Sequence, residues 1–427
     1  MRVVGLRLIA AAALAAALPV AVASASSHAS NAAQNWALPQ IRFVLAKGLF
    51  SESTVATFHP TATLTRQTLT NLAFGLKLAI APPEVTPPGD GYGDGSGYGS
   101  GGTSTTPTVT DPTVTDPTTT DPTTTEPTTT DPTSTLPAVT TPAPAPAPVT
   151  PPAPEKPPAV SDPGGAVTIT ALDSRLVSSL GLANAAIEFA HGAKNAGLTV
   201  PDRFGTEVVA RLLGLRLDHP AAEDFLELRP QDPSTRAEAA YSAAQILGFG
   251  WQANGWQIAA AKELADSFTL PTLTDWQKRI LDVAFSKIGM PYVWGGTSDG
   301  PEAPFGIHAP GGYDCSGFVW RVYKLQSYAG EGSLSSALRG RTTYTMSVEV
   351  PRSELIPRTK LQPADVIFFG HGPNSSSSEI DHMGIYVGNG WFIHSSGYGV
   401  AVARLDGWYA RSFAWGRRPL QEAGLDG

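Results

Sequence analysis

The sequence contains a single cysteine, Cys315, in 427 residues. One thiol cannot form an internal disulfide, so a fold held by disulfides is excluded. Acidic residues outnumber basic ones, 37 to 29, and the net charge of −8 argues against a nucleic-acid partner, which would favour a basic surface. After the first 25 residues, no apolar run is long enough to span a membrane. These features predict a multidomain protein stabilised by packing, with an unpaired thiol that needs another explanation.

The first 25 residues have the pattern of a secretory signal peptide. Arg2 and Arg7 are followed by an apolar run that ends near Val22, and Ala23-Ser24-Ala25 offers small residues for cleavage. A membrane anchor is less favoured because the run is shorter than the ~20 residues that cross a bilayer. We therefore expect residues 1–25 to be removed and the mature chain to be secreted without a membrane span.

Residues 82–165 have almost no apolar side chains to bury. A Gly-rich stretch is followed by a five-residue Pro/Thr repeat that begins at Asp111 and recurs at Asp116, Asp121, Glu126 and Asp131. Proline fixes φ and removes a backbone donor, so we expect a disordered, extended linker, partly in the polyproline II conformation. A wall-spanning spacer and a passive connection both fit this composition.

Helical segments flank this linker. In residues 31–81 a helix is predicted from Trp36 to Lys47, ended by Gly48, and a second runs to Leu78. Residues 166–250 are predicted to hold two further units, with helices at Ala185–Ala196, at Glu207–Leu215 and up to Leu247. Residues 251–273 are interpreted as a connecting segment.

Two of the helix starts share one pattern. Thr65-Arg66 and Thr235-Arg236 each follow a proline at the same distance, and both threonines are predicted N-caps. Glu238 stands where a capping box requires it. The first unit can dock with the other two, since a long loop adds little to the entropic cost of closure, or it can lie apart.

The order of helix, Gly-Leu turn and Thr-Arg-opened helix resembles the S-layer homology repeat. The resemblance is closest for the first and third units. It implies that the helical region binds wall polysaccharide, with Arg66 and Arg236 facing an anionic glycan. The alternative is a plain helical bundle in which both arginines are ordinary helix-start residues.

Residues 274–419 are predicted to form an α+β domain that begins with a helix from Asp275 to Lys287. A second helix is expected to start at Cys315, where unpaired N–H groups and the helix dipole favour the thiolate. Strands are predicted at Val366–Phe369, His382–Val387 and Trp391–Ser395.

The last two strands form a predicted antiparallel hairpin about Gly388-Asn389-Gly390. Pairing about this turn places His382 opposite or nearly opposite His394 on one face of the sheet, close enough for the imidazoles to meet. His382 is therefore the expected base for Cys315, and His394 the residue that orients it.

Four motifs in this domain resemble the NlpC-type family of secreted cell-wall cysteine peptidases. They are Pro291–Gly296 (PYVWGG), Asp314–Phe318 (DCSGF), Leu361–Asp365 (LQPAD) and His382–Gly388 (HMGIYVG). The resemblance, over about residues 277–419, implies a papain-like fold without a cofactor or metal. It implies cleavage of peptidoglycan stem peptides between D-γ-glutamate and the diamino acid, in a bacterial cell wall.

By the same resemblance, Cys315 is the nucleophile, His382 the base and His394 the third residue, while Tyr292, Asp314 and Ser316 line the substrate side. The chain departs from the family pattern where Ala364 replaces a glycine and Met346 replaces a glutamine. Residues 299–312 and 371–380 are longer than usual and are expected to flank the cleft.

Other interpretations of the thiol stay open. A thiol amidase or an acyltransferase can use the same scaffold, and a non-catalytic wall-binding protein can retain it. Cysteine is often buried in cores, so Cys315 can also be structural. Cys315, His382 and His394 are all zinc ligand types, although the sequence has no close-spaced second pair.

Overall fold

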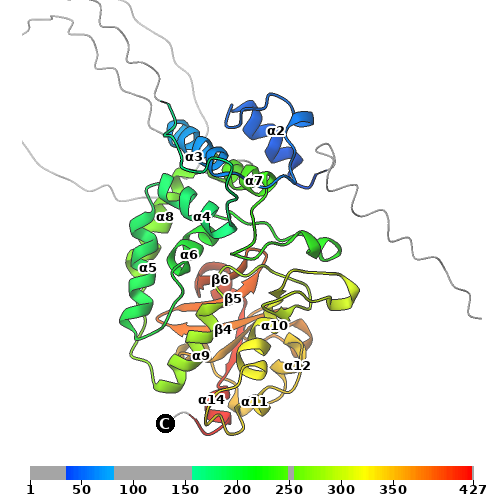
Figure 1. The fold of residues 1–427 in the computed structure, drawn as a ribbon. Coiled ribbons are helices and arrows are strands. Elements are labelled where there is room, and N and C mark those ends of the chain that lie inside the picture. The colour runs from blue at the N-terminus through cyan, green and yellow to red at the C-terminus, as the bar shows by residue number, and fades with distance from the viewer. Residues whose placement is uncertain (1–34, 81–155, 249–253, 426–427) are drawn as a thin grey trace, which may run out of the picture. The chain divides into compact units, whose positions relative to one another are not determined.

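The computed structural model describes residues 35–80, 156–248 and 254–425 (Figure 1). The expected signal peptide and nearly all of the expected linker lie outside these residues. Within the described ranges, no helix is long and apolar enough to cross a membrane.

The described part before the linker and the part after it contribute to one compact unit. Most of the helices predicted in this region are confirmed, and Gly48 and Gly197 end two of them with a positive φ of 68° and 81°. Helix α4 was not predicted, and the segment expected to be a connection contains helix α8. The elements are α2 (Leu38–Ala46), η2 (Val55–Thr57), α3 (Arg66–Ile80), α4 (Ile169–Ser179), α5 (Ala183–Asn195), α6 (Phe204–Leu212), η3 (Ala221–Leu226), α7 (Arg236–Ile246) and α8 (Asn254–Ser267).

The two Thr-Arg helix starts lie side by side. The Leu64 N–H donates to the Ser234 carbonyl at 2.8 Å, and Thr63 and Thr235 form an antiparallel bridge. The first unit therefore docks with the later ones. Thr235 caps α7 as predicted, by accepting from the Glu238 N–H. The predicted capping box is wrong in its second half, because the Glu238 carboxylate pairs with Arg216 at 3.2 Å instead.

The C-terminal domain is built on a five-stranded antiparallel sheet in the order β6-β5-β4-β3-β7. Two of its strands, β6 and β7, were not predicted. Its strands are β3 (Val366–Phe369), β4 (His382–Gly388), β5 (Trp391–Ser396), β6 (Gly399–Arg404) and β7 (Phe413–Arg417), and β1 (Thr297–Ser298) pairs separately with β2 (Gly312–Tyr313).

Helix α10 packs on β4 and β5 of this sheet (Figure 1). The predicted helix α9 is confirmed, with a capping box between Thr274 and Gln277. The domain has one long helix, α9, and several short ones. They are α9 (Asp275–Ser286), η4 (Pro304–Gly306), α10 (Cys315–Trp320), the π-turn η5 (Arg321–Leu325), α11 (Leu334–Ala337), α12 (Thr343–Ser347), η6 (Arg352–Glu354), η7 (Arg358–Lys360), η8 (Ser377–Glu379), α13 (Gly407–Ser412) and α14 (Pro419–Glu422).

Ala364 stands at the turn before β3, where the backbone is left-handed with φ of 69°. This conformation costs a non-glycine residue roughly 1–2 kcal/mol. Ala364 therefore stands at a position where the family's glycine would avoid this strain. The turn persists because the Ala364 N–H donates to the Tyr386 carbonyl at 2.8 Å and its own carbonyl accepts from the Tyr323 hydroxyl.

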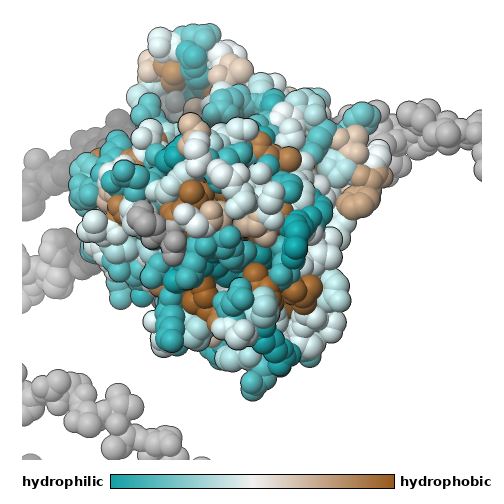
Figure 2. Space-filling view, turned by 90° about the horizontal axis from the view of Figure 1, so that it is seen from below, coloured by the Kyte–Doolittle hydropathy of each residue, from teal (hydrophilic) through white to brown (hydrophobic). Residues whose placement is uncertain are grey.

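One hydrophobic core runs from the helical region into the sheet domain. Phe189 of α5, Phe268 after α8 and Trp391 of β5 pack with ring centroids 5.0–5.9 Å apart. Figure 2 shows that apolar residues form separate patches on a mostly polar surface, seen from below. Packing between the two regions is thus part of the core.

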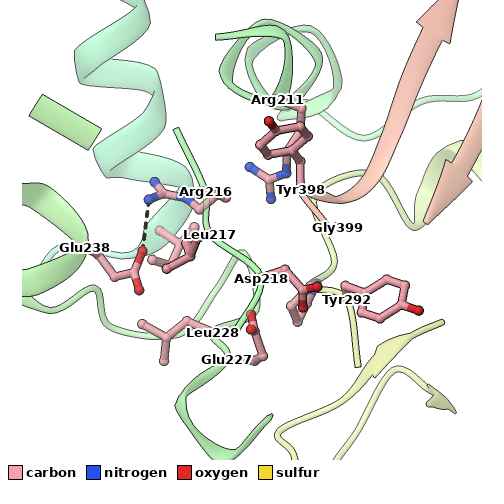
Figure 3. A pocket seen from close by; sticks show the side chains of 12 residues that line it. Arg211, Arg216, Leu217, Asp218, Glu227, Leu228, Glu238, Tyr292, Tyr398 and Gly399 are labelled. Carbon is pink, nitrogen blue, oxygen red and sulfur yellow. Dashed lines mark hydrogen bonds and ion pairs between the residues drawn. The ribbon is translucent and has the colours of Figure 1, made fainter. Parts of the chain in front are cut away.

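A buried network of charged side chains lies where α6 meets Gly289 of the sheet domain, and Figure 3 shows its members Arg211, Arg216 and Glu238. Asp173, Glu207 and Glu238 pair with Arg211 and Arg216. Arg211 also donates to the Gly289 carbonyl of the sheet domain at 2.7 Å. Because unpaired buried charges are costly, this network holds the helices in one position relative to Gly289.

Removing one member of this network should lower the free energy of unfolding substantially. We expect Arg211→Met to lower the free energy of unfolding by about 3–5 kcal/mol, because the buried Glu207 carboxylate loses its ion-pair partner and Asp173 keeps only Arg216. Arg229→Met is the matched control. Its pair with Asp232 is partly exposed, so it should cost less than about 1 kcal/mol. Urea unfolding of both variants measures the difference, and equal costs would contradict the assigned role of the network.

Candidate active site

Cys315 begins helix α10, directly after the N-cap Asp314. Its side chain is buried, and its sulfur lies 3.6 Å from the Thr343 hydroxyl. The backbone N–H groups of Ser316 and Met383 favour the thiolate form of this side chain. Met383 follows His382 in β4, so the packing of α10 on β4 brings the thiol to the strand that carries this histidine.

The buried environment dominates the protonation of this thiol. Burial, with a smaller contribution from Asp314, raises the pKa of Cys315 to about 11, although Thr343 and the two N–H groups lower it. The Ser316 N–H at the helix start lowers the pKa, in the predicted direction, but burial outweighs this effect. Helix α10 has only six residues, and its first N–H groups do not offset the loss of water.

His382 and His394 contact each other directly. The His382 Nε2 lies 2.7 Å from the His394 Nδ1. The observed register pairs Ile385 with Ile393 and Tyr386 with Phe392, which places His394 opposite Gly384 rather than opposite His382. The two histidines lie on one face, as predicted, but on a diagonal.

Gly384 makes this diagonal contact feasible. A Cβ on Gly384 would lie 2.8 Å from the Ile393 carbonyl and 3.0 Å from the His394 Cβ. Contacts below about 3.0 Å are not tolerated without movement, so a side chain here would displace His394. The glycine leaves the space through which the imidazoles approach.

Both imidazoles are held neutral near pH 7. Burial lowers the pKa of His382 to about 4, and burial together with His382 lowers the pKa of His394 well below its usual value. Phe392 and Tyr409 pack around His394 with ring centroids 4.7 Å and 5.4 Å away. The site therefore combines a neutral thiol with two neutral imidazoles.

The predicted substrate residues Asp314 and Ser316 form part of an internal network. Arg341 donates to the Ser316 hydroxyl at 2.7 Å and to Asp314 at 3.2 Å, and the Ser316 hydroxyl donates to Asp314. Asp314 also accepts from the Gly295 N–H at 3.0 Å. These contacts fix the turn before Cys315. The substrate role of Asp314 and Ser316 stays a prediction.

Arg341 and Thr343 were not identified as site residues from the sequence. They stand beside Met346, whose departure from the family glutamine had marked this segment as uncertain. Met346 is fully buried. The sequence signal for these two residues was the string Arg341-Thr342-Thr343. Only the packing of this segment shows that the side chains of Arg341 and Thr343 reach Asp314 and Cys315.

A cleft of about 440 Å³ opens beside His382. Tyr292, a predicted substrate residue, lines it together with Trp294, Trp408 and Tyr409. Its other wall consists of residues from the segment 218–224 of the helical region, which were not predicted. Residues 299–312 and 371–380, which were expected to flank the cleft, contribute no lining residue.

The two arginines of the S-layer-homology resemblance differ in exposure. The Arg66 side chain is 51% exposed and pairs with Asp162 at 3.2 Å. Arg236 is mostly buried, pairs with Glu52 at 2.7 Å and lies over the rings of Phe50 and Phe58. Arg236 is thus engaged inside the protein, and only Arg66 faces outward.

For metal ions, the described residues contain no group of three His, Cys, Asp or Glu side chains placed to hold one.

The neutral state of His382 predicts a pH effect on stability. The unfolded histidine titrates near 6.5 and the folded one near 4, so the unfolded state takes up the proton first as the pH falls. We expect His382 to contribute up to about 3 kcal/mol above pH 6.5, and this contribution should be lost between pH 6.5 and 4.

Urea unfolding at several pH values tests this effect. His382→Gln should show a weaker loss of stability across this range than the natural protein. His371→Gln is the control, because the His371 side chain is 75% exposed, and it should keep the natural slope. Identical slopes in all three proteins would refute the assignment.

The C-terminal domain is similar to known proteins. Residues 289–418 match the model of the NlpC/P60 family. The chain is 30% identical over 131 residues to "Probable peptidoglycan endopeptidase LytE" of Bacillus subtilis, covering 31% of this chain and 30% of that protein. It is 28% identical over 121 residues to the gamma-D-glutamyl-L-lysine dipeptidyl-peptidase of the same organism, covering 28% and 31%.

A crystal structure of an NlpC/P60 family protein from Bacillus cereus is 25% identical, covers 36% of this chain and 43% of that one, and has a TM-score of 0.26. The chain spans less than a third of the length of the two curated relatives. The matched region contains Cys315, His382 and His394 together with the sheet that carries the histidines. Residues 289–418 of this chain thus form an NlpC/P60 domain.

Proposed function

We propose that this protein is a cysteine endopeptidase that hydrolyses peptidoglycan stem peptides between D-γ-glutamate and the diamino acid. One observation carries the proposal: a buried thiol beside the Thr343 hydroxyl, on a helix packed against the strand of a hydrogen-bonded histidine pair. The family match supports the substrate class, as do the two relatives, one named a probable peptidoglycan endopeptidase and the other a gamma-D-glutamyl-L-lysine dipeptidyl-peptidase.

The protonation states favour proton transfer together with attack. The Cys315 sulfur attacks the glutamyl carbonyl carbon while its proton passes to His382. The carbonyl oxygen becomes negatively charged, and the Cys315 N–H is its proposed donor. His382 then gives the proton to the departing amine, which leaves a thioester. Water, deprotonated by His382, attacks this thioester, releasing the carboxylate and restoring the thiol.

The histidine contact assigns the tautomers that this mechanism needs. The His382 Nε2 faces His394, so Nδ1 is the ring nitrogen left to accept the thiol proton. His382 must then carry its own hydrogen on Nε2 and donate it to the His394 Nδ1. His394 acts as a positioning residue: it fixes the tautomer and the ring orientation of His382.

Defined substrates test the reaction. The natural protein should release the diamino acid from L-Ala-γ-D-Glu-diamino acid peptides, seen by mass spectrometry as cleavage at the γ-glutamyl bond. Cys315→Ala and His382→Ala should lose this activity by at least about 10³-fold. His371→Ala, which alters an exposed histidine, is the matched control and should remain active.

The products also separate the alternatives. Release of the intact stem peptide from the sugar lactyl group would indicate an amidase, and transfer of an acyl chain would indicate an acyltransferase. Unchanged digestion of muropeptides by Cys315→Ala would refute the thiol mechanism.

We further propose that the helical region binds wall polysaccharide. The resemblance to S-layer homology repeats supports this role, as does a groove lined by Arg66 and Arg175. Both arginines extend from helices that lie side by side, α3 and α4. Because Arg236 is engaged by Glu52, it is left out of this proposed glycan surface.

Sedimentation with purified cell walls tests this binding. The full-length chain should pellet with walls that carry their polysaccharide and remain in solution with acid-stripped walls. The double variant Arg66→Ala, Arg175→Ala should lose most of this binding, because two cations facing the groove are removed. Arg42→Ala, an exposed arginine on α2, should bind as the natural protein does. Equal pelleting of all proteins would contradict the proposed surface.

A further inference from the structure

A second pocket, of about 370 Å³, lies beside the end of helix α12 and shares no lining residue with the cleft at His382. We call it the α12 pocket. Ser347 and Arg352 line it from α12 and the segment that follows, Ser375 and Ser377 line it from the loop between β3 and β4, and Trp415 lines it from β7. The long loop at residues 371–380 therefore flanks this pocket and not the cleft.

The α12 pocket lies close to the reacting thiol. Thr343, whose hydroxyl is 3.6 Å from the Cys315 sulfur, begins α12, and Ser347 ends it. A helix rises about 1.5 Å per residue, so the pocket begins roughly 6 Å from Thr343 along this helix. On the loop side, Ser377 belongs to η8, directly before the strand that starts at His382. A peptide held at Cys315 thus needs to extend only about 6–10 Å to enter the pocket.

The loop that forms one wall of this pocket is held by its own hydrogen bonds. The His371 N–H donates to the Ser375 hydroxyl at 2.8 Å, and this hydroxyl donates to the Gly372 carbonyl at 2.7 Å. The Glu379 carboxylate accepts from the Ser376 N–H at 2.7 Å and pairs with His371 at 3.1 Å. Because these bonds lie within the loop, the wall is formed before any ligand binds.

Trp415 brings a hydrogen-bond donor to the α12 pocket. Its side chain is 8% exposed, and its Nε1 is buried without a partner among the described residues. An indole nitrogen only donates, and a buried donor without an acceptor is unfavourable. A ligand oxygen that accepts from this N–H would remove that cost. The indole therefore favours a ligand with an acceptor group.

The charge of the α12 pocket specifies which acceptor group. Arg352 is the one charged side chain among the described residues that line the pocket. Glu354, on the same turn, lines a different pocket. The cleft at His382 has the opposite character, because Asp218 and Asp224 line it without a lysine or arginine from the described residues. An anionic group is consequently favoured in the α12 pocket and disfavoured in the cleft.

We infer that the α12 pocket binds the C-terminal carboxylate of the peptide that leaves during the reaction, with Arg352 and the Trp415 indole as the binding groups. This inference rests on the proposed function, which makes a stem peptide the substrate. Val348 and Leu355 also line the pocket and offer apolar contacts to a small side chain such as the methyl group of D-alanine.

The reach of the chain selects the carboxylate. An extended peptide advances about 3.3 Å per residue, so the carboxylate of the diamino acid itself lies only about 3–4 Å beyond the cleaved bond. One or two D-alanines after the diamino acid carry the carboxylate to about 7 or 10 Å. These two lengths match the distance from the thiol to the α12 pocket, and the shorter peptide does not.

Peptides of three lengths test the inference. They are L-Ala-γ-D-Glu-L-Lys and the same peptide with one or two D-alanines added, each with a free C-terminal carboxylate and as the C-terminal amide. With the full-length natural protein, amidation should lower kcat/KM by about tenfold or more for at least one of the longer peptides, because a charged hydrogen bond is lost, and should leave the tripeptide within about twofold. The length that shows the loss identifies the carboxylate bound.

The D-glutamate carboxylate is the same in all six peptides, so it does not affect this comparison. An equal effect of amidation at all three lengths, whether large or absent, would overturn the inference. A loss confined to the tripeptide would overturn it as well.

Variants of the two binding groups test the pocket itself. Arg352→Gln and Trp415→Phe should reduce the acid-to-amide ratio of kcat/KM toward one, and the phenylalanine keeps a ring while removing the indole N–H. Arg358→Gln, at an exposed arginine of η7 that does not line the pocket, should keep the natural ratio. Each ratio is measured within one protein preparation, so partial unfolding of a variant does not alter it. Retention of the full ratio by either Arg352→Gln or Trp415→Phe would overturn the inference.

The leaving products L-Lys-D-Ala and L-Lys-D-Ala-D-Ala separate this inference from the proposed reaction. Calorimetry compares the binding of each product and of its C-terminal amide to the Cys315→Ala protein. Tighter binding of an acid than of its amide, without turnover of any peptide by the natural protein, would support the α12 pocket and refute the endopeptidase proposal. Turnover without any preference for the acid would support the endopeptidase and overturn the α12 pocket. Absence of both turnover and acid-dependent binding would refute both.

Discussion

The packing of helix α10 on strand β4 is the interaction on which the active site depends. It places the Cys315 sulfur at the Met383 N–H, one residue from His382. The same contact buries the thiol. Asp314 and Arg341 support it from the other side, because they fix the turn that enters α10. The packing of α10 on β4 therefore determines both the position of the thiol and its protonation state.

Burial shifts the pKa of the thiol and the pKa values of the two imidazoles in opposite directions, and both shifts favour the neutral forms. It disfavours every charged form, so the pKa of the thiol rises and the pKa values of both imidazoles fall. Burial thus disfavours an ion pair between the thiol and an imidazole in this site. The neutral pair places the charge separation in the reaction step, where the N–H groups around the sulfur and the proposed oxyanion donor are already in position.

Sequence periodicity and capping residues predicted most of the helices and the central hairpin, because these features depend on local interactions. They also predicted that His382 and His394 share a face, since side chains alternate along a strand. The diagonal register, the roles of Arg341 and Thr343, and strands β6 and β7 were not predicted. Each depends on contacts between residues distant in sequence, which periodicity does not report. The second wall of the cleft was missed for the same reason: Asp224 meets Trp294 across 70 positions.

The buried charge network fixes the helical region against the sheet domain. Ion pairs removed from water contribute little net stability compared with apolar packing, but they penalise any arrangement that separates them. Here they lie where α6 meets the sheet domain, with Arg211 bound to Gly289 and Arg203 bound to the Ser286 carbonyl. An anchor that only tethered the enzyme would need no such constraint, since a flexible connection would serve. A region that supplies one wall of the cleft beside His382 does need it, because the shape of the cleft depends on where that wall is held.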